Sequence, residues 1–126
     1  MANTTNTTDK TIVLLSRGID DERATVAWTL ANAGVANGQD VTVFCVSAGV
    51  DVLRTGAASV VQMNPHDPSM MELITSFMEN GGTVWACPPC SSLRGYTEDQ
   101  FIDRVKITGA GPVYDLIKDG AATICL

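Results

Sequence analysis

Short apolar runs, each bounded by polar residues or glycine, constrain the fold of this chain more than any other feature. The first, at residues 11–16, is made almost wholly of β-branched and apolar residues and ends before Arg17-Gly18. A continuous run of this kind is typical of a strand that is covered on both faces. Similar runs predict further strands at residues 40–47, 83–87, 105–108 and 121–126.

Helical patterns lie between these runs. Residues 24–36 repeat small residues at helical spacing, after three acids whose charges favour a helix start. Asp67 is predicted to cap a second helix over residues 68–80, and a capping-box spacing predicts a short helix over residues 97–104. A further helix follows the glycine-rich turn at residues 109–112. Strands that alternate with helices form βαβ units, so we expect an α/β protein with a mainly parallel sheet of about five strands.

Length, charge and the N-terminal segment narrow the class of protein. A chain of 126 residues is predicted to form one domain over residues 10–126, after a polar and flexible tail at residues 1–9. The tail lacks the apolar segment of a signal peptide, and no run approaches the length of a membrane span. Four cysteines without an export signal indicate a reducing compartment, so the cytoplasm is predicted. The net charge of −6, without a basic cluster, argues against nucleic acids and anionic membranes as partners.

The strongest chemical signal is the segment Cys87-Pro88-Pro89-Cys90, which follows the third predicted strand. In parallel sheets the working groups lie beyond the carboxyl ends of the strands, and Cys87 is placed at such an end. A thiol reacts as the thiolate, so a reactive cysteine needs an accessible and electropositive setting. Arg94 is predicted to lower the pKa of Cys87 by its charge. Cys45 and Cys125 lie inside apolar runs and are predicted to be buried and inert.

Three chemistries are open to the cysteine pair. The spacing matches that of thioredoxin-type dithiol–disulfide exchange. A structural zinc site needs four ligands, so His66 and either Cys45 or Cys125 would have to converge on the pair. The third chemistry is carriage of sulfane sulfur as a cysteine persulfide. A fourth reading makes the loop structural, within a non-enzymatic oligomeric binding module. No metal and no cofactor is predicted.

A resemblance to a known family bears on the third chemistry. The resemblance rests on the segments at residues 17–24, 30–33, 38–44 and 49–50, and on the spacing Cys87-x-x-Cys90-x-x-x-Arg94-Gly95. Together these patterns resemble the DsrE/DsrF-like family, in its YchN-like branch. The resemblance covers most of the chain from residue 11 to residue 96.

The resemblance implies a flavodoxin-like three-layer sandwich that assembles into homotrimers or hexamers. It also implies a sulfur relay, in which the persulfide-bearing cysteine corresponds to Cys87. Cys90 has a counterpart only in the YchN-like members, and the Pro88-Pro89 pair departs from the relay pattern. We therefore predict a sulfurtransferase-like carrier with donor and acceptor proteins as partners, and with Cys87, Cys90 and Arg94 as its site residues. In that prediction Cys90 is a resolving or auxiliary thiol.

Overall fold

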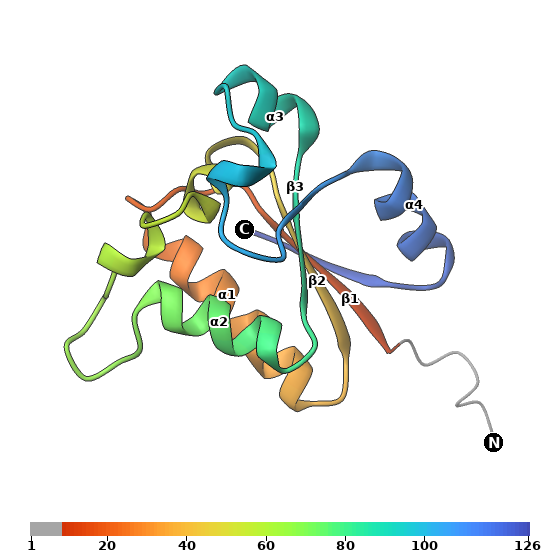
Figure 1. The fold of residues 1–126 in the computed structure, drawn as a ribbon. Helices are drawn as coiled ribbons and strands as arrows, with labels where there is room; N and C mark the ends of the chain where they lie inside the picture. Colours follow the sequence, from red (N-terminus) through yellow and green to blue (C-terminus); the bar gives the residue numbers. More distant parts are fainter. Residues whose placement is uncertain (1–8) are drawn as a thin grey trace.

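The computed structural model describes residues 9–126, and the predicted tail lies almost wholly outside the described residues. A single sheet of five strands runs through the molecule (Figure 1), in the order β4-β3-β2-β1-β5. Every pairing in this sheet is parallel, which confirms the predicted α/β class. The strands are β1 (Lys10–Leu15), β2 (Asp40–Cys45), β3 (Thr83–Ala86), β4 (Lys106–Ile107) and β5 (Ala122–Cys125).

The hydrophobic core lies between one face of this sheet and two helices, α1 (Glu22–Ala36) and α2 (Met70–Glu79). The small residues of α1 let it lie close to the strands, since a Cβ added at Gly34 would stand only 2.8 Å from Val41 Cγ2. Trp28 of α1 and Phe77 of α2 are fully buried, with their ring centroids 5.9 Å apart in an edge-on contact. This packing fixes α1 and α2 as one layer beneath the sheet.

The direction of the chain explains which face each connection covers. From β1 to β4 successive strands are added in one direction, so right-handed connections all fall on the same face. The step from β4 to β5 runs back across the sheet, and α4 (Ala110–Lys118) accordingly lies on the opposite face (Figure 1). The result is the predicted three-layer sandwich. Its second helical layer is thin, because no residue of α4 is buried.

Several local predictions need correction. Ser69, and not Asp67, caps α2, because Ser69 and Glu72 form a reciprocal capping box. The helix predicted from residue 97 to residue 104 is only the 3₁₀ turn η4 (Glu98–Gln100). Cys125 is exposed, because β5 is an edge strand that α4 leaves uncovered. Within residues 9–126, no helix is both long enough and apolar enough to span a bilayer.

Candidate functional site

Cys87 lies between the end of β3 and the start of a short helix, at a place where the sequence predicted no helix. Its backbone N–H donates to the Cys45 carbonyl oxygen at 2.9 Å, which extends the β3–β2 ladder by one bond. The next six residues form α3 (Pro88–Leu93), with Cys87 in extended conformation as its N-cap. Proline suits the first turn of a helix, since the N–H it lacks would have no partner within the helix. The Pro88-Pro89 pair is therefore a helix-initiating feature.

The sheet order places Cys87 at a favourable position for a site. The connection after β3 returns through core residues on the side of α1 and α2, whereas the connection after β4 crosses to α4 on the other side. Neighbouring strands whose connections leave in opposite directions open a crevice at their carboxyl ends. Figure 1 shows α3 projecting above this end of the sheet. Pro88, Pro89 and Leu93 are exposed there, with Leu93 at 83%.

The two predicted site thiols belong to the same turn of α3. Cys87 is the N-cap and Cys90 is the third helical residue, and both are half-buried. Partial burial raises the pKa of the Cys87 thiol above its ordinary value, and the neighbouring Cys90 thiol raises it further. The backbone N–H of Cys90 acts in the opposite direction and favours the thiolate, but its effect is smaller than that of burial. The prediction of a lowered pKa at Cys87 is wrong for this state of the protein.

A backbone donor from another part of the chain serves Cys90. The Ser47 N–H donates to Cys90 Sγ at an N–S distance of 3.1 Å. Ser47 opens the 3₁₀ helix η2 (Ser47–Leu53) just after β2, and its φ of +52° lies in the left-handed region. A serine in that region costs on the order of 1 kcal/mol, so the surrounding structure holds this N–H in place.

Arg94 contacts both α3 and η2. Its Nη1 donates to the Cys90 carbonyl oxygen at 3.2 Å, and its Nε lies 3.5 Å from Asp51 Oδ1. The Tyr96 hydroxyl donates to the same carboxylate oxygen at 2.6 Å, a bond that raises the pKa of Tyr96. Arg94 is thus engaged with Asp51 and with the backbone of Cys90.

Sequence reasoning missed Ser47, Asp51 and Tyr96 as parts of this site. Their contacts join residues 43 to 45 positions apart, and no motif in the sequence links them. The single available signal was the position of Ser47, the last residue of a predicted strand that ends at the same sheet edge as Cys87.

The remaining cysteines lie elsewhere. Cys45 is fully buried, as predicted, and burial raises its thiol pKa. Cys125 lies on β5, which β1 and β2 separate from β3. The zinc alternative required one of them to meet His66 and the cysteine pair. Over the described part of the chain, no three His, Cys, Asp or Glu side chains gather in a way that could hold a metal ion.

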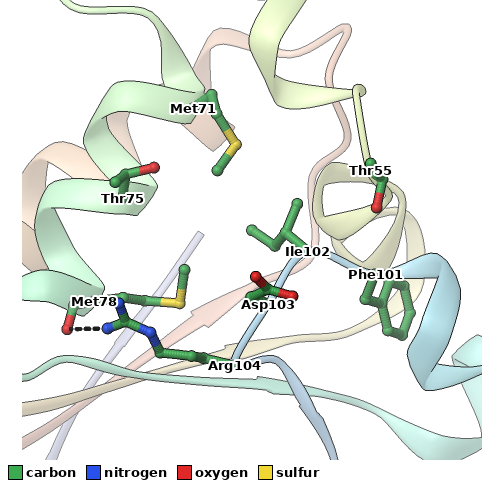
Figure 2. A pocket seen from close by; sticks show the side chains of 8 residues that line it. All are labelled: Thr55, Met71, Thr75, Met78, Phe101, Ile102, Asp103 and Arg104. Atoms are coloured by element: carbon green, nitrogen blue, oxygen red, sulfur yellow. Dashed lines mark hydrogen bonds between the residues drawn. The ribbon is translucent and has the colours of Figure 1, made fainter.

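Cavities flank the helical layer and not the cysteine pair. One of about 390 Å³ lies between α2 and residues 101–104, where Met71, Thr75 and Met78 face Ile102 and Arg104 (Figure 2). Arg104 Nη1 donates to the Met78 carbonyl oxygen at 3.2 Å across its edge. Two others, of about 490 and 460 Å³, border α1. None of these three is lined by Cys87, Cys90 or Arg94, so the thiols stand apart from these hollows on the projecting helix.

Comparisons with known proteins agree with this architecture. A model of the DsrE/DsrF-like family matches residues 9–126. An uncharacterized protein of Methanopyrus kandleri is 30% identical over 110 residues, which cover 86% of each chain. An uncharacterized protein of Methanocaldococcus jannaschii is 29% identical over 108 residues, or 85% of this chain and 87% of its own.

Two solved structures share the fold. The YchN protein from E. coli superposes with a TM-score of 0.74 at 18% sequence identity, over 94% of this chain and 100% of YchN. A protein of unknown function from Methanobacterium thermoautotrophicum gives a TM-score of 0.69, also at 18% identity, over 93% of this chain and 98% of its own. At these identities the likeness establishes the fold alone.

Proposed function

The chain belongs to the DsrE/DsrF-like family, and from that premise we propose that it is a sulfur carrier that relays sulfane sulfur between proteins as a persulfide on Cys87. The observation that carries this proposal is the placement of Cys87. Its half-buried thiol lies at the carboxyl end of β3, at the N-cap of a helix that projects from the molecule.

The surroundings of Cys87 suit exchange with another protein. Three of the four exposed residues of α3 are apolar, namely Pro88, Pro89 and Leu93, and the two prolines stiffen its first turn. Exposed apolar side chains beside a reactive group are typical of a docking surface. The cavities flanking α1 and α2 do not reach the thiol, and this supports a macromolecular donor and acceptor over a small substrate held in one of those pockets.

The relay consists of two sulfur transfers. In the first, the Cys87 thiolate attacks the outer sulfur of a donor persulfide, a new S–S bond forms on Cys87, and the donor leaves as a thiolate. In the second, an acceptor thiolate attacks the outer sulfur now on Cys87, and Cys87 leaves with the electron pair. The raised pKa of Cys87 means that the free thiol rests protonated. The proton that Cys87 loses on attack passes to the departing donor thiolate, so the transfer leaves no charge behind.

A second candidate function is dithiol–disulfide exchange. The observation in its favour is that Cys87 and Cys90 occupy the N-cap and third positions of one helix and interact through their thiols. A redox protein of this kind would show exchange at a defined potential, and each single variant, Cys87→Ser or Cys90→Ser, would abolish it.

We further propose that the carrier is a homo-oligomer, a trimer or a hexamer, built through the thin side of the sandwich. In support, α4 buries no residue and β5 is exposed along its whole length. Tyr114, Ile117 and Ile124 are 63%, 42% and 38% exposed on that side. Light scattering on the purified protein tests this assembly, and a monomer at all concentrations would contradict it.

Intact-mass analysis tests the carrier function. Reduced protein is incubated with polysulfide or thiosulfate and then freed of small molecules. We expect Cys90→Ser to gain the mass of one sulfur atom and Cys87→Ser to gain none. Cys125→Ser in the Cys90→Ser background is the matched control, because it removes an exposed thiol from another strand and is expected to gain one sulfur atom like Cys90→Ser alone. No adduct on any variant would refute the proposal.

A further inference from the structure

We propose that Cys90 resolves the persulfide of Cys87 when no acceptor protein is bound, so that the chain releases its sulfur as hydrogen sulfide and is left with a Cys87–Cys90 disulfide. This inference rests on the proposed carrier function and adds a second product to it. Three features of the structure point to it: the helical positions of the two thiols, the donor at Ser47, and the contacts of Arg94.

The helical positions bring the two sulfurs within reach of each other. A side chain at the N-cap of a helix lies next to the backbone N–H of the third helical residue, as in the usual capping arrangement. Here these positions are held by Cys87 and Cys90, so both side chains lie on one turn of α3, and each thiol is close enough to affect the other's charge. The prolines between them stiffen this turn, so a bond between the thiols requires little rearrangement of the backbone.

The donor at Ser47 holds Cys90 in place for attack. Its N–H donates to Cys90 Sγ at an N–S distance of 3.1 Å, which fixes this sulfur on the turn that also carries Cys87. The left-handed φ of Ser47 aims this N–H, and Gly49 two residues later lets η2 lie against the Leu15 carbonyl.

Arg94 and Asp51 act as positioning residues for Cys90. Arg94 binds the Cys90 carbonyl oxygen and reaches Asp51 of η2, the element that also carries Ser47. Tyr96 fixes the same carboxylate. These contacts tie α3 to η2 next to the Ser47–Cys90 hydrogen bond.

The resolving step balances without an outside reactant. The Cys90 thiolate attacks Sγ of the Cys87 persulfide, and a bond forms between the two cysteine sulfurs. The bond from Cys87 Sγ to the outer sulfur breaks, and the outer sulfur leaves with the electron pair as HS⁻ and takes up a proton. The outer sulfur is reduced by two electrons, and the two cysteines are oxidised to the disulfide. A dithiol or two equivalents of a small thiol then restore the pair.

The test measures sulfide and protein mass together. Reduced protein is mixed with glutathione persulfide, sulfide is measured in timed aliquots by derivatisation with monobromobimane, and separate aliquots are analysed for intact protein mass. We expect wild type to release one sulfide per chain and to lose two hydrogens. Cys90→Ser is expected to keep the added sulfur and to release no sulfide above the level of Cys87→Ser.

The outcomes separate this inference from the carrier function. If Cys90→Ser takes up no sulfur, the carrier function fails. If Cys90→Ser takes up sulfur but wild type also keeps it, on either cysteine, and forms no disulfide, the carrier function stands and the resolving role of Cys90 is overturned.

Asp51→Asn tests the positioning role without removing a reacting group. Loss of the charge beside Arg94 is expected to slow sulfide release by about two- to fivefold. The matched control is Asp103→Asn, which alters an exposed carboxylate away from the thiols and leaves the rate unchanged. Sulfur uptake by Asp51→Asn in a Cys90→Ser background is expected to match that of Cys90→Ser alone. An unchanged release rate in Asp51→Asn would refute the positioning role.

Discussion

Gly49 joins the stability of the sheet to the geometry of the site, so its replacement by alanine is the most informative structural perturbation. A Cβ at this position would stand 2.2 Å from the carbonyl oxygen of Leu15 and 3.1 Å from its carbonyl carbon. The obstacle is backbone, since Leu15 ends β1 and its carbonyl also accepts the Val46 N–H at 2.9 Å. Either the end of the sheet or the start of η2 must therefore move.

The magnitude follows from the cost of overpacking. An extra methyl group in a closely packed interior destabilises a protein by about 1–3 kcal/mol, and contact with a strand backbone places Gly49→Ala toward the upper end. The unfolding entropy typical of a chain of 126 residues converts 1 kcal/mol into about 4 °C. We therefore expect the melting temperature to fall by about 4–12 °C.

The assay compares Gly49→Ala with a glycine replacement in open space. A Cβ at Gly111 of α4 would meet nothing within 4 Å, so Gly111→Ala is expected to be neutral or to stabilise the helix by up to about 1 kcal/mol. Urea midpoints and melting temperatures are measured for both variants and the wild type. A Gly49→Ala protein as stable as the wild type would refute the reasoning from the Leu15 contact.

Three further predictions concern the capping of α2, the acid limb of stability and the reactivity of Cys87. Ser69→Ala removes the capping box of α2 and is expected to lower the free energy of unfolding, measured in urea, by about 1 kcal/mol. Asp67→Ala should lower it by almost nothing, and equal effects of the two variants would contradict the assignment of Ser69 as the cap. Hydrogen bonds from Arg23 hold the pKa of Asp21 at about 2, below its ordinary 3.8. The Asp21–Arg23 pair therefore stabilises the folded protein fully above pH 3.8, and this contribution is lost as the pH falls through about 2. Asp21→Asn should therefore flatten the acid limb of a stability–pH curve, and an unchanged limb would count against this pairing. Because burial raises the pKa of the resting Cys87 thiol, its alkylation by iodoacetamide, followed by peptide mapping, should reach its plateau at a higher pH in the folded protein than in the urea-unfolded chain. A plateau at the same or a lower pH would contradict the raised pKa.

The strands were predictable because their signal is local. Continuous apolar runs bounded by glycine or polar residues coincide with β1, β2 and β3 to within two residues at either end. Parallel pairing then followed from the alternation with helices. The exposure of Cys125 did not follow, because an apolar run does not reveal whether its strand lies at the edge of the sheet or how well the facing helix covers it.

The candidate site was predictable only in part. The spacing of Cys87, Cys90 and Arg94 identified the segment, but it does not reveal that Pro88 and Pro89 form the first turn of α3. Ser47 and Asp51 come from the turn after a different strand and meet Cys90 and Arg94 only in the folded chain. The pKa of Cys87 is raised chiefly by burial, and the spacing of residues along the chain does not reveal burial.

The central claim is that sulfane sulfur is carried on Cys87, and the most direct test is to locate that sulfur. Reduced Cys90→Ser is loaded with polysulfide, its persulfide is trapped by alkylation, and the tryptic peptide that spans residues 55–94 is fragmented. Cys87 is the one remaining cysteine of that peptide, whereas Cys125 reports on uptake elsewhere. The account predicts one additional sulfur on Cys87 and none on Cys125. An unmodified Cys87, or sulfur found equally on both cysteines, would contradict it.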